Sequence, residues 1–285
     1  MDRFGLFVDA GYLLAAGGEL CVGQKKRSKF FCDCEAVHER LVSFCAEHSK
    51  LPPLRTYWYD GGYGSPHPQP TSEQLRIAAL SRVKLRLGRV IHGQQKGVDS
   101  MITRDLMTLA RERAMPIAYL LSGDEDLREA VVAAQDLGVQ VVLLGITPIA
   151  GLTNQSFTLV NECDARQLLD KEFLSPFFSL APIESKVQAE PLLAPIVNIM
   201  PERSVEEAAD ELGRTYCDSW FGRVGGDVAL LVFSRAPMVP ADVDASLLRH
   251  AESVFGSLRS REELRKRIRQ AFVARLTEKV HELNA

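Results

Sequence analysis

Two apolar runs, at residues 4–8 and 117–121, have the composition of strands that are buried on both faces of a parallel sheet. Asp9 directly follows the first run, and Asp124 and Asp126 come just after the second. Because sites in open α/β sheets form outside the carboxyl ends of strands, where the strand order reverses, we expect these acids to meet. Such a cluster needs a compensating cation, and its hard oxygen ligands suit Mg²⁺ or Mn²⁺. The pattern predicts a metal-dependent hydrolytic site that acts on a phosphodiester.

A further acid, Asp99, stands where the Lys96-Gly97 pair leads into a predicted helix. The first turn of a helix offers free amide N–H groups and the positive end of the helix dipole. Asp105 comes six residues later, about 240° further round the helix. We therefore expect Asp99 to face the other acids. We expect Asp105 to contact at most the residues that bind the metal, and not the metal itself.

Three sequence blocks resemble the NYN domains, a branch of the PIN-like ribonuclease superfamily. The blocks are FVDAGYL (7–13), KGVDSMITRDL (96–106) and LSGDEDL (121–127), and the resemblance extends over about residues 3–170. It implies a ribonuclease that depends on Mg²⁺ or Mn²⁺ and acts on RNA. The catalytic and metal-binding acids that it implies are Asp9, Asp99, Asp124 and Asp126.

The chain departs from the family pattern at Tyr12, because many members carry Asn three residues after the first acid. This departure implies either a different grip on the substrate or weaker catalysis. Around the acids, Lys96 would pair with a phosphate, and Ser122 would bond to the attacking water or orient a carboxylate. The basic run that leaves the same sheet edge is either a solvated loop or a contact surface for the RNA backbone. Its candidate residues are Lys25, Lys26 and Arg27.

Strand and helix patterns alternate through the first part of the chain. Strands are predicted over residues 3–8, 54–59, 83–87, 117–121 and 139–144, and helices over residues 33–48, 98–113 and 127–137, with another from Ser72. We expect residues 12–31 to form a long loop, residues 83–87 to be an edge strand, and residues 157–169 to add a small strand and helix. This alternation predicts a three-layer α/β fold, PIN-like or Rossmann-like, in which helices cover both faces of a parallel sheet.

The boundaries that we expect are a nuclease domain over residues 1–175, a proline-rich linker over 176–201 and a small, mainly helical accessory domain over 202–285. In the last segment, capping boxes predict helices after Ser204 and Ser260. An apolar run at 228–233 predicts a strand, so a winged-helix-like module is one interpretation. The basic stretch at 265–269 is either the polar face of a packed helix or a surface for nucleic acid or a partner.

The composition sets wider bounds. The net charge of −3 over 285 residues gives no global attraction to nucleic acid, so any basic footprint must be local. No apolar run reaches transmembrane length, and the six cysteines form no CxxC pair. We therefore expect a cytoplasmic protein with free thiols and no membrane partner. RNA is the expected ligand, and residues 202–285 are the expected surface for a homo-oligomer or a protein partner.

Two other functions remain open. A catalytically weak or inactive protein would bind RNA or a nucleotide through the same acids, and Tyr12 is the residue that favours it. An aspartyl phosphohydrolase would use Asp9 as its nucleophile. The DxD pattern expected of that class is absent, because Ala10, Gly11 and Tyr12 follow Asp9.

Overall fold

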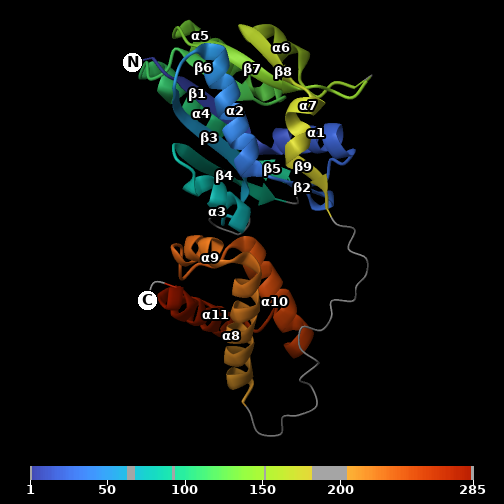
Figure 1. Cartoon of the computed structure of the whole chain (residues 1–285), viewed down its shortest axis with the longest axis vertical. Helices are drawn as coiled ribbons and strands as arrows, with labels where there is room; N and C mark the ends of the chain where they lie inside the picture. The colour runs from blue at the N-terminus through green and yellow to red at the C-terminus, as the bar shows by residue number, and fades with distance from the viewer. Residues whose placement is uncertain (1, 63–67, 92–93, 151, 182–203, 284–285) are drawn as a thin grey trace. The chain divides into compact units, whose positions relative to one another are not determined.

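The computed structural model describes residues 2–62, 68–91, 94–150, 152–181 and 204–283 (Figure 1). The chain divides into two compact units, which we describe separately. The first unit comprises Met1–Pro68 and Ile77–Ile183, and the second comprises Gln69–Arg76 and Glu184–Ala285. Within the described ranges, no helix is both long enough and apolar enough to cross a membrane.

The first unit is built on a seven-stranded sheet with the order β5-β4-β3-β1-β6-β7-β8. Only β5 is antiparallel to its neighbour, and the other six strands run parallel. The strands are β1 (Phe4–Asp9), β3 (Pro53–Gly62), β4 (Val83–Ile91), β5 (Gln94–Lys96), β6 (Ile117–Leu121), β7 (Gln140–Ile146) and β8 (Ala165–Leu169). The parallel α/β fold expected from the sequence is therefore confirmed. Strand β5 pairs only with residues 89–91 of β4, so residues 83–87, where we expected an edge strand, pair with β3 alone among the described strands.

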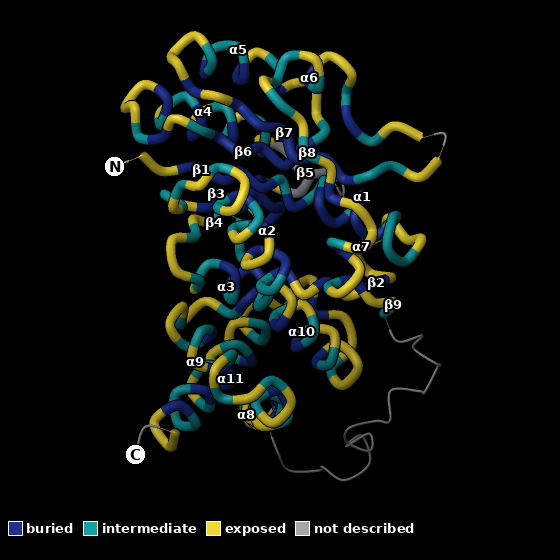
Figure 2. Tube along the Cα trace, turned by 45° about the horizontal axis from the view of Figure 1, so that its top comes forward, coloured by how far each residue is buried: buried dark blue, intermediate teal, exposed yellow. Residues whose placement is uncertain are grey.

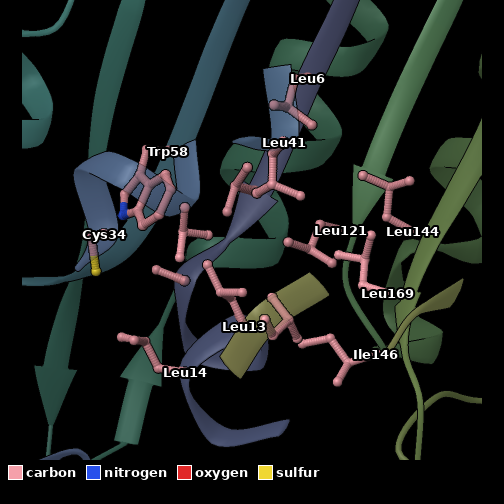
Figure 3. Close-up of a cluster of buried hydrophobic side chains, with 14 of the residues drawn as sticks. Leu6, Leu13, Leu14, Cys34, Leu41, Trp58, Leu121, Leu144, Ile146 and Leu169 are labelled. Atoms are coloured by element: carbon pink, nitrogen blue, oxygen red, sulfur yellow. The ribbon is translucent and has the colours of Figure 1, made fainter. Parts of the chain in front are cut away.

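Helices bury both faces of this sheet, which is why the central strands β1 and β6 are buried along nearly their whole length (Figure 2). One face packs against α1 (Ala10–Val22), α2 (Cys34–Ser49) and α7 (Lys171–Leu174), and the other against α4 (Val98–Arg111), α5 (Arg128–Asp136) and α6 (Phe157–Glu162). Figure 3 shows the first of these cores, in which Leu6 of β1 and Leu41 of α2 are fully buried. Each such side chain contributes roughly 1.5–3 kcal/mol of burial free energy.

The segment after Asp9 is a helix, α1, and not part of the long loop expected over residues 12–31. Asp9 caps this helix, and the glycines serve close packing. A Cβ on Gly17 would lie 2.6 Å from the ring of Phe178, and a Cβ on Gly18 would lie 2.6 Å from the ring of Phe30. The two rings belong to a small antiparallel pair of strands, β2 (Phe30–Cys32) and β9 (Phe178–Leu180).

Strand β9 also corrects the expected start of the linker at residue 176. Residues 178–180 pair with β2 and so belong to the first unit, whereas residues 182–201 lie outside the described part of the chain. In the 157–169 segment the helix comes before the strand. Helix α6 ends at Glu162, and β8 starts at Ala165 and pairs with β7.

In the second unit, residues 204–283 form four helices: α8 (Val205–Val224), α9 (Gly226–Phe233), α10 (Ala241–Phe255) and α11 (Glu262–Leu283). The capping box of Ser204 with Glu207 is confirmed. The strand expected at 228–233 is wrong, because these residues form α9 and bury Ala229 and Val232, which are spaced three apart as on a helix face. Residues 204–283 contain no strand, and so they lack the wing of a winged helix.

Candidate metal centre

The strand order reverses between β1, the central strand of the sheet, and its neighbour β6. From β1 the chain continues to β3 on one side, whereas β6 continues to β7 on the other. Val8 pairs with Leu121 across this junction, so the residues that follow them, Asp9 and Ser122, emerge side by side. The Ser122 hydroxyl, which is buried, donates a hydrogen bond of 3.2 Å to Oδ2 of Asp9. This junction is where parallel α/β sheets form their binding sites.

Asp9 is held by two hydrogen bonds. Its Oδ1 accepts the backbone N–H of Tyr12 at 3.2 Å, which caps α1, and its Oδ2 accepts the Ser122 hydroxyl. Burial raises the pKa of Asp9 from 3.8 to about 6, and the charge of Asp99 adds to the rise, whereas the two hydrogen bonds oppose it. The protein therefore holds a carboxylate here at an electrostatic cost.

Asp99, Asp124 and Asp126 converge more tightly. Each offers one carboxylate oxygen, and the three oxygens lie within 4.8 Å of one another. Asp99 stands in the first turn of α4, just after Gly97, whose φ of 82° turns the chain into the helix. Asp124 caps the short helix η2 (Glu125–Leu127), where its Oδ1 accepts the N–H of Asp126 at 3.1 Å. Different elements thus deliver the acids to one point.

The electrostatics of this cluster fit a divalent cation. Burial raises the pKa of Asp99, and the charges of Asp124 and then Asp126 raise it further. Neither Asp9 nor any acid of the cluster forms an ion pair with a lysine or arginine whose side chain the structure describes. An open cavity of about 480 Å³ is lined by Asp9, Asp99, Asp124, Tyr12, Glu125 and Asn154, among others. A cavity whose described lining is acidic and carries no lysine or arginine, with hard oxygen donors, suits Mg²⁺ or Mn²⁺.

Asp9 lies on the wall of this cavity but is not part of the tight cluster. The family resemblance implied that Asp9, Asp99, Asp124 and Asp126 all bind the metal. The structure instead groups Asp99 with Asp124 and Asp126, because Asp9 is turned onto Ser122 and the start of α1.

Tyr12 lines the cavity, but its hydroxyl is engaged in the wall. The hydroxyl oxygen accepts the N–H of Ile146 at 3.0 Å, and the hydroxyl donates to Oδ1 of Asn154 at 3.3 Å. Its ring packs on Gly123, where an added Cβ would approach to 2.9 Å. Burial raises the pKa of Tyr12 to about 12, so the hydroxyl keeps its proton at neutral pH. Tyr12 therefore joins the end of β7 to the cavity.

Sequence reasoning missed three residues of this site. Glu125 and Asn154 line the cavity, and the buried Gln155 lies behind it. The Gln155 amide donates to the carbonyl oxygens of Ser122 at 2.7 Å and Leu144 at 3.2 Å, which ties the ends of β6 and β7 together. The available signal was their place after predicted strands: Glu125 follows β6, and Asn154 and Gln155 follow β7, and both strands end at the same sheet edge as β1.

Asp105 points away from the acid cluster, as its helical spacing predicts. It is buried, and its carboxylate accepts bonds from Nε of Arg86 at 2.8 Å and from the Tyr59 hydroxyl at 3.1 Å. The hydrogen bond to Asp105 raises the pKa of Arg86, and burial, followed by the charge of Asp105, raises the pKa of Tyr59. Asp105 thus holds β3 and β4 against α4, and its direct contacts are with these residues.

The basic candidates have mixed placements. Lys25 pairs with Glu19 at 3.1 Å, and Arg27 pairs with Asp60 at 2.9 Å. Lys26 is exposed and forms no ion pair with a described residue. Lys96 ends β5, but its side chain lies outside the described part of the chain.

Comparison with known proteins adds three findings. The sequence model of the NYN domain matches residues 3–169. The uncharacterized protein y4oD of Sinorhizobium fredii is 42% identical over 144 residues, which are 50% of this chain and 65% of that protein. The chain therefore spans slightly less than two thirds of this relative. A crystal structure of a protein of unknown function from Vibrio parahaemolyticus, VPA0982, is 19% identical, covers 61% of this chain and 96% of its own, and has a TM-score of 0.42.

Proposed function

This chain belongs to the NYN domain family, and we propose that it is a ribonuclease that hydrolyses RNA phosphodiester bonds with Mg²⁺ or Mn²⁺. One observation carries the proposal: Asp99, Asp124 and Asp126 come within 4.8 Å of one another with no described cation to neutralise them. A structural role for these acids would instead leave each with an arginine, a lysine or a full set of hydrogen-bond donors, as Asp105 has.

The acids divide the work between them. Asp99, Asp124 and Asp126 would hold the ion, which when bound polarises the phosphoryl oxygens and lowers the pKa of a water molecule. Asp9, on the same cavity wall, would accept the proton of the attacking water. The Tyr12 N–H and the Ser122 hydroxyl fix the orientation of its carboxylate for this role.

A second pocket, of about 220 Å³, adjoins the acidic cavity and shares Tyr12 and Asn154 with it. Its walls are apolar at Ile149 and Leu152, which are 41% and 52% exposed. Lys25 stands at its rim. An apolar wall beside a lysine, which here pairs with Glu19, suits an unstacked base and its phosphate, so we assign this pocket to the nucleotide next to the scissile bond.

The experiment is an assay of the purified protein on structured and single-stranded RNAs with Mg²⁺, Mn²⁺ or a chelator. We expect Asp124→Asn to lower the cleavage rate by at least about 100-fold, because even substitution of a residue that hydrogen-bonds to a metal ligand typically lowers metal affinity or activity about 10- to 100-fold. Asp33→Asn is the matched control, since Asp33 is an exposed cap of α2 that accepts the N–H of Ala36 at 3.1 Å. Cleavage that persists in chelator, or that Asp124→Asn leaves intact, contradicts the proposal.

A second candidate function is RNA or nucleotide binding without turnover. The observation that favours it is the Tyr12 side chain, which occupies the cavity wall and whose hydroxyl is engaged with Ile146 and Asn154. Calorimetric binding of Mn²⁺ that depends on Asp99 and Asp124, combined with no cleavage of any RNA, would support this function. A phosphorylated Asp9 trapped during turnover would instead indicate an aspartyl phosphohydrolase.

A further inference from the structure

The second unit contains a cavity lined by three arginines. It measures about 260 Å³ and lies where α10, the turn after it and the start of α11 meet. Arg249 comes from α10, Arg259 from the turn and Arg265 from the first turns of α11. Leu248 and the buried Leu258 supply an apolar part of the wall.

The guanidinium group of Arg265 is only partly satisfied. Its Nε is buried and has no hydrogen-bond partner. In the described part of the chain, the guanidinium groups of Arg249, Arg259 and Arg265 form no ion pair. A buried donor without an acceptor destabilises the folded protein, so a ligand that supplied the acceptor would recover this free energy.

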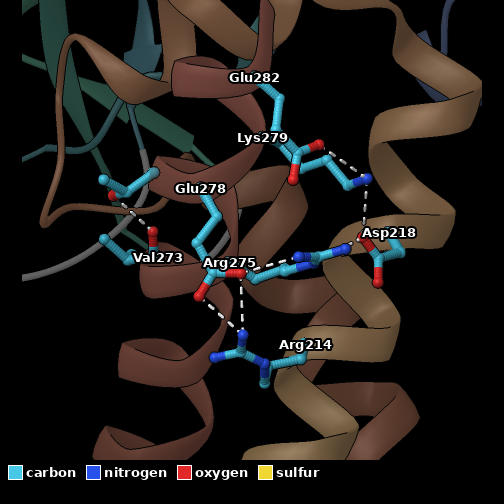
Figure 4. Close-up of polar contacts among 8 residues, drawn as sticks. Arg214, Asp218, Val273, Arg275, Glu278, Lys279 and Glu282 are labelled. Carbon is cyan, nitrogen blue, oxygen red and sulfur yellow. Dashed lines mark hydrogen bonds and ion pairs between the residues drawn. The ribbon is translucent and has the colours of Figure 1, made fainter.

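Neighbouring cations of the same helix behave differently. Arg267 forms a two-bond pair with Asp210 at 2.9 and 2.6 Å, and Arg269 forms one with Asp244 at 2.6 and 2.8 Å. Lys266 pairs with Glu263 at 2.9 Å. Further along α11, Arg275 lies between Asp218 and Glu278 (Figure 4). Within the basic stretch 265–269, Arg265 is thus set apart by its lack of an acid.

The one acid of the cavity wall, Glu252, is already engaged. Its Oε1 accepts the N–H of Leu258 at 3.3 Å, a bond that holds the turn carrying Arg259. Arg261, which is close in sequence, donates to the carbonyl oxygen of Phe255 at 3.1 Å. The cavity wall therefore carries three cations against one anion, in a protein whose net charge is −3.

We propose that this cavity binds a phosphate group of RNA. Guanidinium groups bind phosphate through paired N–H bonds, and three of them around one cavity match the several oxygens of a phosphodiester. The cavity has the volume of several water molecules, each about 30 Å³, and its leucine wall suits the ribose next to the phosphate. Phosphate binding follows from the cavity itself, whereas the choice of RNA as its source rests on the proposed function.

The test measures binding of a fluorescent single-stranded RNA to the full-length protein in chelator, so that cleavage plays no part. We expect Arg265→Gln to weaken binding roughly tenfold or more, since bonds to a charged group contribute about 1.5–3 kcal/mol. The slope of log K against log salt should become shallower by about 0.7 for each phosphate that the variant no longer neutralises. Arg267→Gln removes the same charge from the same helix, but from a paired arginine, and it should leave the affinity within about twofold.

Arg249→Gln and Arg259→Gln are further variants that should not disturb folding, because both side chains are exposed. Each should weaken RNA binding in the same direction as Arg265→Gln, and inorganic phosphate should compete with RNA for the wild type. Equal affinities of Arg265→Gln and Arg267→Gln for RNA would overturn the proposal. It would also be overturned if Arg265→Gln lost binding to polyglutamate, an anionic polymer without phosphate, but kept its binding to RNA. Because the assay excludes catalysis, a positive result with no ribonuclease activity would refute the proposed function and leave this site standing.

Discussion

Asp9→Asn should stabilise the metal-free protein at neutral pH. Asparagine has nearly the shape of aspartate, can still accept the Tyr12 N–H and caps helices as well. It removes a negative charge that is costly in the folded state, where burial raises the pKa from 3.8 to about 6. A rise of that size corresponds to about 3 kcal/mol at pH 7. We therefore expect the free energy of unfolding to increase by up to about 3 kcal/mol.

The sign of the pH dependence follows from the direction of the shift. The folded protein holds the proton of Asp9 more tightly than the unfolded chain does. The ionised Asp9 carboxylate therefore destabilises the wild type fully above pH 6, and this destabilisation disappears below pH 3.8. The advantage of Asp9→Asn should therefore fall to about half near pH 5 and to well under 1 kcal/mol, about 0.5, at pH 4.

The assay is urea denaturation of wild type and variant in chelator from pH 4 to pH 8. Asp33→Asn is the control, because Asp33 caps α2 in the same way at an exposed position, and it should change stability by only a few tenths of a kcal/mol, about 0.3. Added Mn²⁺ should then stabilise the wild type more than Asp9→Asn. A variant that is no more stable at pH 7, or whose advantage does not shrink with acid, would refute this account of Asp9.

Two other variants separate the parts of the site. Tyr12→Phe removes the acceptor of the Ile146 N–H and the donor to Asn154, so the unfolding free energy should fall by about 1–2 kcal/mol; an unchanged denaturation midpoint would contradict the observed bonds. Asp105→Asn leaves Arg86 without its carboxylate and should lower stability by about 2–3 kcal/mol. Cleavage per folded molecule should be unchanged in Asp105→Asn, and a selective loss of activity would place Asp105 in the reaction.

The order of the central elements could be predicted from the sequence, because strands buried on both faces must be apolar throughout. The runs before Asp9 and Asp124 show this directly, and the helix capped by Asp33 starts where its cap predicts. Local patterns failed where packing decided the outcome. Gly17 and Gly18 lie in the stretch expected to be a loop, yet they belong to α1, where only a missing side chain lets Phe178 and Phe30 approach. The run at 228–233 suggested a strand, yet it packs as a helix among other helices.

The sequence by itself determined that several carboxylates would emerge at one edge of the sheet, because a strand end sets the position of the residue after it. Only the tertiary structure decided which of them lie close enough together to share an ion, since that depends on side-chain directions and on bonds between distant segments. Ser122 draws Asp9 away from the cluster, and Arg86 and Tyr59 hold Asp105 elsewhere. Likewise, nothing in the basic stretch at 265–269 distinguishes Arg265 from Arg267. The difference arises because Asp210 lies on α8 opposite one of them, while the other faces a cavity.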